Sequence, residues 1–285
     1  GEKPWDCKQP RVVVEDNVTK RRVVVTGMGM LTPLGNDVAS SWQALQQGKS
    51  GVDFITHFDT EAYSTKFAGL IKNFAVEDFF PAKEARKMDL FIQYGVAAGI
   101  QAFRDSGIEI TEQNAGRIGA AIGSGIGGLR TFEDECFNFA KGDGTPKFNP
   151  FFIPKMIADS ASGVISIRHG FRGVNYVTVS ACSSANNAII DAFNYIRLGR
   201  LKACVTGGSE APVTIASVGG FTALRAMSER NDDPKSASRP YDKDRDGLIP
   251  SGGAATLIIE SLESAQKRGA KILGEIIGYG FSSNG

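Results

Sequence analysis

Residues 175–199 read NYVTVSACSSANNAIIDAFNYIRLG, and this stretch indicates the fold class. Its first part, 175–180, is rich in β-branched and aromatic residues, which is typical of a β-strand. From Ser183 to Leu198 the apolar residues recur at the spacing of an α-helix, and Gly199 follows where a helix would end. We therefore expect a strand that turns directly into a helix.

Cys182 lies at this turn, at the N-terminus of the expected helix. Unpaired backbone N–H groups and the positive end of the helix dipole favour a thiolate at such a position. The sulfur is therefore a candidate nucleophile. A free cysteine is more commonly a small buried hydrophobe, and the position alone leaves both interpretations open.

The rest of the chain alternates short β-rich runs with longer helical patterns. We expect further strands at 22–26, 117–122, 203–206, 254–260 and 271–279, and helices at 37–47, 83–106 and 154–169, the first with Asn36 as its N-cap. Such alternation is typical of an α/β fold with a mostly parallel sheet flanked by helices. Functional sites in these folds collect at the carboxyl ends of strands, which is where Cys182 lies.

Composition favours a soluble enzyme. The 285 residues are 42% hydrophobic and 22% charged, and a net charge of +1 gives no electrostatic reason to expect nucleic-acid binding. No apolar run is long enough for a membrane span, and the first twenty residues lack the apolar segment of a signal peptide. The four cysteines show no CxxC pairing, which fits reduced thiols in a bacterial cytoplasm, a plastid or a mitochondrion, and we expect Cys136 and Cys204 to be buried fillers.

Several motifs along the chain resemble those of the β-ketoacyl-acyl-carrier-protein synthases of type II fatty-acid synthesis. They occur in the family's order: RVVVTGMG (22–29), KEARKMD (83–89), GSGIGG (123–128), NPFFIP (149–154), VSACSSANN (179–187), VGGF (218–221), NDDPKSASRP (231–240) and RDG (245–247). The resemblance implies a thiolase-like fold built from two similar halves. Residues 21–268 would form a complete first half and 269–285 only the first strand of the second, while residues 1–20 would be an extension, a tag or a linker.

The resemblance also implies a chemistry, decarboxylative Claisen condensation. Cys182 would carry the acyl group as a thioester, and Ile126 and Phe221 would border the acyl pocket. The partners implied are acyl-carrier protein and a second copy of the chain, with no metal, cofactor, nucleic acid or membrane. Carrier-protein docking would use basic residues that suit an acidic partner: Lys83, Arg86, Lys87, Lys147 and Arg225. For Lys83, Arg86 and Lys87, a solvated helix face is the simpler explanation.

Two departures from the family pattern affect this expectation. The family's two catalytic histidines and supporting lysine lie in segments that do not occur here, and the histidines of this chain are His57 and His169. The segment SGGA (251–254) also differs from the family's usual glycine run. Alternatives are therefore a non-catalytic subunit that binds carrier protein, similar to a chain-length factor, and a hydrolase that uses Cys182 with another base such as His169.

Two further motifs suggest ligands that we do not expect to bind. Residues 123–128 satisfy the G-x-G-x-x-G pattern of dinucleotide sites, but no acidic residue ends a second strand about 20 positions later. Residues 242–247 read DKDRDG and begin like a calcium loop, but the twelfth position is Gly253 instead of glutamate. Close backbone packing and a structural turn explain these segments better.

Overall fold

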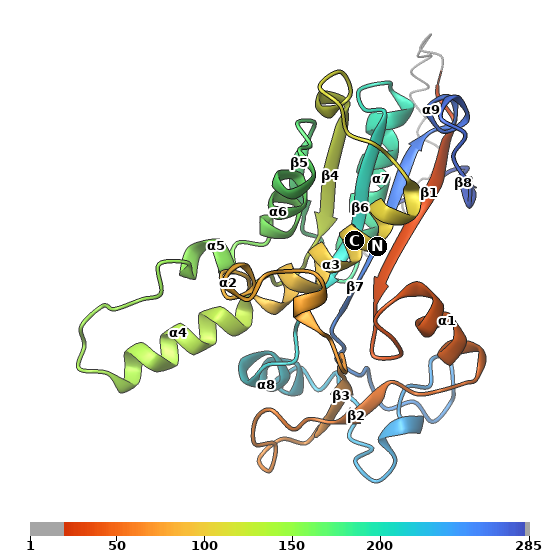
Figure 1. Ribbon diagram of the computed structural model, residues 1–285. Coiled ribbons are helices and arrows are strands. Elements are labelled where there is room, and N and C mark those ends of the chain that lie inside the picture. Colours follow the sequence, from red (N-terminus) through yellow and green to blue (C-terminus); the bar gives the residue numbers. More distant parts are fainter. Residues whose placement is uncertain (1–19, 283–285) are drawn as a thin grey trace, which may run out of the picture.

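A six-stranded sheet with helices on both faces organises residues 20–282, which are the residues described in this computed structural model (Figure 1). Residues 1–19, which hold nearly all of the expected extension, lie outside the described part. The strand order is β5-β4-β6-β7-β1-β8. The strands are β1 (Val23–Leu31), β4 (Ile118–Gly123), β5 (Asn175–Thr178), β6 (Ala203–Glu210), β7 (Gly253–Ser261) and β8 (Gly274–Ile276). A separate hairpin pairs β2 (Val52–Phe54) with β3 (Phe67–Gly69).

The expected α/β class is confirmed, but the sheet is mixed instead of mostly parallel. β4 pairs in parallel with β5 and β6, whereas β7 runs antiparallel between β6 and β1. β8, where we expected a longer strand over 271–279, pairs antiparallel with the start of β1. The parallel strands β5, β4 and β6 therefore form one side of the sheet, and Cys182 follows the outermost of them.

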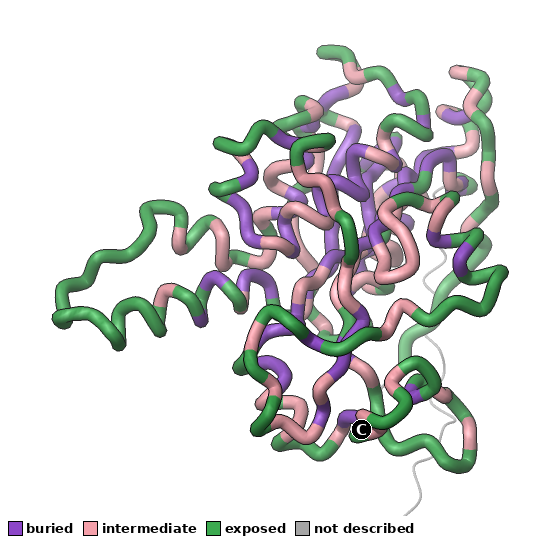
Figure 2. Tube along the Cα trace, turned by 60° about the horizontal axis from the view of Figure 1, so that its bottom comes forward, coloured by how far each residue is buried: buried purple, intermediate pink, exposed green. Residues whose placement is uncertain are grey.

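Two helical layers cover the sheet. α3 (Leu90–Ser106) and α6 (Ser160–His169) pack on one face, and α7 (Ser184–Arg197) packs on the other. Side chains alternate between these layers along β4, because Ile118, Ala120 and Ile122 join the core under α3 whereas Ala121 joins the core under α7. Figure 2 shows that the buried residues are concentrated in these three layers.

Two long helices that we expected are each interrupted. Residues 83–106 divide into α2 (Ala82–Ala85) and α3, because Asp89 is an N-cap whose side chain accepts a hydrogen bond from Phe91 N. Residues 154–169 divide into α5 (Phe152–Met156) and α6. The N-cap of α1 (Val38–Gln46) is Asp37 and not Asn36, since the Asp37 carboxylate accepts from Ser40 N at 2.6 Å.

An arm formed by α4 (Leu129–Lys141), the following loop and α5 projects from the domain (Figure 1). Residues 136–151 of the arm are exposed, including Cys136, so our expectation that this cysteine is buried is wrong. Cys204 is fully buried in β6, as expected.

The remaining helices are α8 (Ile215–Ala223), α9 (Leu262–Lys267) and the 3-10 turns Val76–Asp78, Ala115–Arg117 and Pro234–Ser236. Within residues 20–282 no helix has the length and apolarity to cross a membrane.

His169 ends α6 inside an aromatic cluster. Its ring centroid lies 4.2 Å from that of Phe103 and 5.5 Å from that of Phe171. Its buried Nε2 has no hydrogen-bond partner among the described residues. Burial, together with the positive charges of Arg168 and Arg104, lowers the pKa of His169 from 6.5 to about 4. The imidazole is thus neutral in the folded protein at neutral pH.

This pKa makes stability depend on pH. The unfolded chain takes up the His169 proton near pH 6.5 and the folded chain only near pH 4. The stability that the neutral His169 ring contributes to the folded state is therefore present above pH 6.5 and is lost as the pH falls toward 4. Because the ring is only partly buried, we expect a loss of about 1 to 2 kcal/mol. Chemical unfolding at a series of pH values should show a smaller loss of unfolding free energy in His169→Phe, which keeps the aromatic stacking, than in the unsubstituted protein. The same pH dependence of the unfolding free energy in both proteins would contradict this assignment.

Candidate active site

Cys182 is exposed at the carboxyl edge of the parallel strands. It lies between β5, which ends at Thr178, and α7, which begins at Ser184. The expected strand-to-helix turn is confirmed, with both boundaries within two residues of those expected. Since the side chain is exposed and not packed in the core, the buried-filler interpretation of Cys182 is wrong.

Hydrogen bonds hold this turn in an unusual backbone conformation. Ala181 has φ +50°, which is the left-handed region that side-chain-bearing residues seldom adopt. Its carbonyl accepts from Ser184 N at 3.1 Å and from Ser184 Oγ at 2.7 Å. The Ser184 hydroxyl in turn accepts from Ser180 N at 2.9 Å, and Asn187 Nδ2 donates to Ser180 Oγ at 2.7 Å. Within residues 20–282 the backbone N–H of Cys182 donates to no other group, so this donor is free for a ligand.

Two glycines let the first turn of α7 lie directly on the sheet. A Cβ at Gly123, the last residue of β4, would clash with the carbonyl of Ser184. A Cβ at Gly208 in β6 would lie 2.6 Å from the Cβ of Ala185. Any larger residue at either strand position would push the helix N-terminus, and Cys182 with it, away from the sheet.

The glycine-rich loop after β4 packs against the same turn. An added Cβ at Gly125 would lie 3.4 Å from Ala181 O, so this loop and the Cys182 turn are in van der Waals range. At its other end, Gly128 N donates to Met156 O at 3.1 Å. Gly127 has φ +69°, which explains the preference for glycine at that position. The loop is thus held between the turn and the end of α5.

Glu210, the last residue of β6, binds this loop and was not singled out by the sequence. Its Oε2 accepts from Gly125 N at 2.7 Å and from Ile126 N at 3.2 Å. Its Oε1 accepts from Ser124 Oγ at 3.2 Å and from Gly127 N at 3.3 Å. Burial raises the pKa of the Glu210 carboxyl, and the loop hydrogen bonds offset part of that rise. The only sequence signal was an acidic residue ending a glycine-rich buried strand.

These contacts argue against a dinucleotide site in the loop. A pyrophosphate binds through free backbone N–H groups at such a turn. Here the N–H groups of Gly125, Ile126 and Gly127 already donate to Glu210, whose carboxylate would also repel a phosphate. The glycines therefore serve close packing, as expected from the sequence.

The two residues expected to border the acyl pocket have different surroundings. Ile126 is 39% exposed and adjoins Gly125, which places it beside the Cys182 turn. Phe221 is half-buried on α8 and packs against a satellite core formed by Ile55, Ala68, Val213, Val218 and Met227. The pocket roles of Ile126 and Phe221 both stay predictions.

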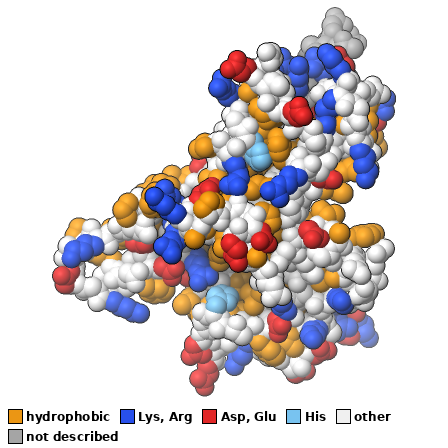
Figure 3. Space-filling view, in the orientation of Figure 1, with side chains coloured by type: hydrophobic (Ala, Val, Ile, Leu, Met, Phe, Trp, Pro, Cys, Tyr) orange, Lys and Arg blue, Asp and Glu red, His pale blue; other side chains and the backbone are white. Residues whose placement is uncertain are grey.

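The five basic residues expected to dock a partner are all exposed. Lys83, Arg86 and Lys87 lie on α2 and the turn after it, and Lys87 Nζ sits 5.1 Å from the centroid of the Phe151 ring at the base of the arm. Figure 3 shows Lys and Arg side chains gathered where α2 meets the arm. Lys147 lies in the arm loop and Arg225 directly after α8, so the five residues occupy three segments. Their docking role stays a prediction.

Neither histidine is placed to act as a base for Cys182. His169 precedes β5 and Cys182 follows it, so the strand separates them toward opposite edges of the sheet. His57 is exposed in the loop after β2, and its Nε2 lies 2.8 Å from Val213 O. The Cys182–His169 pair that a hydrolase would need is therefore absent from the described structure.

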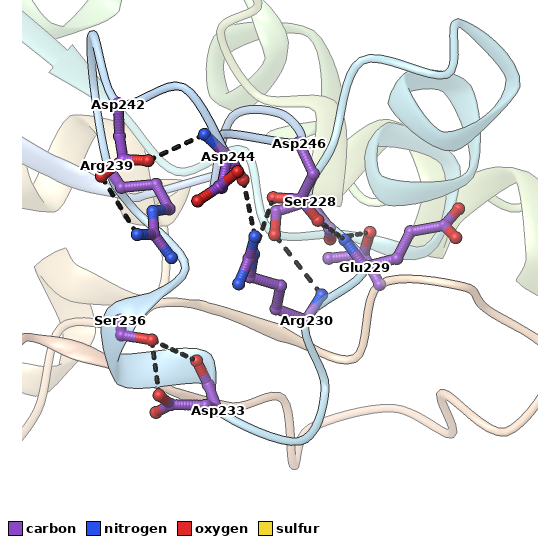
Figure 4. Close-up of polar contacts among 10 residues, drawn as sticks. Ser228, Glu229, Arg230, Asp233, Ser236, Arg239, Asp242, Asp244 and Asp246 are labelled. Atoms are coloured by element: carbon purple, nitrogen blue, oxygen red, sulfur yellow. Dashed lines mark hydrogen bonds and ion pairs between the residues drawn. The ribbon is translucent and has the colours of Figure 1, made fainter.

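The acidic segment 242–247 forms a turn held by arginines (Figure 4). Asp242 Oδ2 accepts from Arg239 Nη2 at 3.0 Å, and Asp246 Oδ1 lies 3.5 Å from Arg230 Nε. Arg230 Nη2 also donates to Asp244 O at 2.6 Å. The carboxylates of Asp242 and Asp246 are thus already paired with arginines. No group of metal-binding side chains occurs among the residues that the structure describes.

Comparison with known proteins gives consistent matches. Residues 20–265 match the family described as "Beta-ketoacyl synthase, N-terminal domain". The 3-oxoacyl-[acyl-carrier-protein] synthase 2 of Vibrio cholerae is 51% identical over 94% of this chain, and that of Staphylococcus aureus is 48% identical over 91%. The chain covers 64% and 62% of those proteins, respectively, and so spans less than two thirds of their length.

Solved structures give the same assignment. A β-ketoacyl synthase from Burkholderia phymatum superposes with a TM-score of 0.84 at 34% identity, covering 93% of this chain and 65% of that one. A ketosynthase structure in complex with a type II polyketide-synthase acyl-carrier protein gives a TM-score of 0.81 at 28% identity, covering 91% and 62%. The likeness extends over nearly the whole described domain.

The cysteine environments predict a labelling order. Exposure and the helix N-terminus favour reaction at Cys182, whereas burial raises the pKa of the Cys204 thiol to about 12 and blocks access. Limited iodoacetamide treatment near neutral pH, read by peptide mass spectrometry, should modify Cys182 about tenfold faster than exposed Cys136 and leave Cys204 unmodified. The variant Cys182→Ala is the control. Equal rates at Cys182 and Cys136 would contradict an activated thiol.

Proposed function

The chain belongs to the β-ketoacyl synthase family, and on that basis we propose that the protein elongates fatty-acyl chains by decarboxylative Claisen condensation. The observation that carries this proposal is the exposed Cys182 at the N-terminus of α7, beside a free backbone donor. The reaction would belong to type II fatty-acid synthesis in a bacterial cytoplasm, a plastid or a mitochondrion.

In the first half-reaction Cys182 is the nucleophile. Its thiolate attacks the thioester carbonyl of acyl-carrier protein, and the carrier's sulfur leaves as a thiolate while the acyl group becomes bound to Cys182. The free N–H of Cys182 would stabilise the oxyanion that forms during this transfer. The residues of this chain thus supply the nucleophile and one oxyanion donor.

The second half-reaction needs groups beyond these residues. Malonyl-carrier protein loses CO2, the resulting enolate carbon attacks the Cys182 thioester, and the sulfur leaves as a thiolate. Donors must stabilise the enolate. We do not assign this role to the histidines of the chain, because His57 Nε2 lies against Val213 O and His169 is enclosed in an aromatic cluster before β5. We assign this role to the part of the relatives' length that the chain does not span.

Two partners follow from this function. The first is an acidic carrier protein, for which Lys83, Arg86 and Lys87 offer an exposed basic surface. The second is another copy of the chain, which would cover exposed aromatic side chains of the arm: Phe132, Phe137, Phe139 and Phe148. The alternative of a non-catalytic partner subunit is less well supported, because an exposed cysteine in this strained turn has no structural purpose that we can identify.

Ile126 provides a test of the acyl pocket. Ile126→Phe should shorten the longest acyl chain loaded onto Cys182, because an added ring in a packed tunnel costs about 1 to 3 kcal/mol or blocks the tunnel. Intact-protein mass spectrometry after incubation with acyl donors of increasing length gives the profile. Ile167→Phe is a matched control, since Ile167 is 84% exposed on α6. An unchanged profile in Ile126→Phe would show that the acyl chain lies elsewhere.

The second half-reaction provides a test of the inventory of catalytic groups. The 285-residue chain should transfer acyl groups weakly to Cys182 and form no detectable 3-ketoacyl product, because an electrostatic donor set of the missing kind commonly contributes 10²- to 10³-fold. Release of radiolabelled CO2 and product analysis measure this, with Cys182→Ala as the blank. Robust product that disappears in His169→Ala would refute the proposal that the donors lie outside this chain.

A further inference from the structure

Glu210 accepts hydrogen bonds from the glycine-rich loop, a contact that the motifs of the chain do not account for. It is a half-buried carboxylate at the carboxyl end of β6, and all four of its hydrogen bonds come from the glycine-rich loop 124–127. No cation is paired with it among the described residues. Removing a carboxylate from water without a cation is costly, so the hydrogen bonds must be well matched to the charge.

The glycine-rich loop connects Glu210 to the Cys182 turn and to Ile126. Gly125 lies between the Glu210 carboxylate and the carbonyl of Ala181, since a Cβ there would be 3.3 Å from Glu210 Oε2 and 3.4 Å from Ala181 O. The next residue is Ile126, whose own N–H donates to Oε2. The backbone on which the Ile126 side chain stands is therefore fixed by Glu210 on one side and by the Cys182 turn on the other.

We propose that Glu210 is a positioning residue for the acyl pocket, which fixes the height of Ile126 above the Cys182 turn and thereby the length of acyl chain accepted. This role rests on the proposed function, in which Cys182 carries the acyl group. Glu210 acts through the loop and touches neither the sulfur nor the acyl carbonyl. It is thus a determinant of specificity and not a catalytic residue.

The hydrogen-bond pattern singles out one informative substitution. Both carboxylate oxygens accept from N–H groups, Oε2 from Gly125 and Ile126 and Oε1 from Gly127. In Glu210→Gln, either orientation of the amide would set an NH2 donor against a backbone donor. The variant keeps the volume of the side chain and loses part of the loop attachment.

A matched control exists in the same region. Glu133 is a buried carboxylate at the start of α4, 8% exposed, and its two hydrogen bonds both end on Oε1, from Thr214 Oγ1 at 2.6 Å and Ala216 N at 2.8 Å. In Glu133→Gln the amide oxygen can replace Oε1 without a donor clash. The same chemical change is therefore expected to be tolerated there. Ser124→Ala is a milder second variant should Glu210→Gln fail to fold, because it removes one contact to Glu210 and the hydroxyl that accepts from Gly127 N. Its informative amides are therefore those of Gly125 and Ile126.

The experiment has two readouts. Hydrogen exchange should be about tenfold faster at the amides of residues 125–127 in Glu210→Gln, less so in Ser124→Ala, and unchanged in Glu133→Gln. Acyl loading of Cys182 should shift toward longer chains by about tenfold in the ratio of long to short donors. Iodoacetamide labelling of Cys182 should stay within about twofold, because the turn itself is intact. Ile126→Phe should also lose most of its effect in the Glu210→Gln background.

The outcomes separate this inference from the function on which it rests. Unchanged amide exchange, or an unchanged acyl ratio with additive effects of Glu210→Gln and Ile126→Phe, would overturn the positioning role. Failure of the unsubstituted protein to accept any acyl group would refute the proposed function and the pocket role together. Even then, amide exchange would decide whether Glu210 holds the loop.

Discussion

Direct backbone contact between the first turn of α7 and the central strands is the constraint on which the site depends. Gly123 and Gly208 permit it, because a side chain on either would occupy the space of Ser184 or Ala185. The contact brings the helix N-terminus, with its unpaired N–H groups, to the carboxyl edge of β4 and β6. The strained φ of Ala181 is tolerated because the Ser184 amide and hydroxyl both bind its carbonyl. Packing thus fixes where Cys182 lies and what surrounds it.

Buried or half-buried carboxylates connect segments that the sheet itself does not hold together. Asp89 caps α3 and also accepts from Thr131 N at 3.1 Å, which ties α3 to α4. Glu133 joins α4 to the first turn of α8, and Glu210 joins β6 to the glycine-rich loop. In each case the acceptor meets backbone N–H groups at a turn or a helix start, where the helix itself leaves donors unpaired. Together these three carboxylates fix the base of the arm, most of which is exposed.

The sequence predicted the fold class and the place of the nucleophile because these depend on local periodicity. The strand-to-helix turn at Cys182 is an example, since a β-rich run is followed directly by apolar residues at helical spacing. The sequence failed where distant contacts decide. Asp89 looks like a residue within a helix, but it caps α3 and also binds the start of α4. Gly27 and Gly29 look like the end of a strand, but β1 continues through them to Leu31. Glycine is found there because α3 packs closely against both positions. The direction of β7 likewise follows from topology and not from its apolar pattern.

The arrangement implies a division of chemistry along the chain. Under the proposed function, three groups that accept an acyl chain lie within the described residues: the Cys182 thiol, its free N–H and the Ile126 wall held by Glu210. None of the described histidines can stabilise an enolate there, since His169 is enclosed by Phe103 and Phe171 and His57 contacts Val213. Specificity for the acyl chain would then be set by glycine contacts and one carboxylate in this half, independently of the groups that decarboxylate malonate. A change in loop 124–127 should therefore alter which chain is loaded before it alters how the carbon–carbon bond forms.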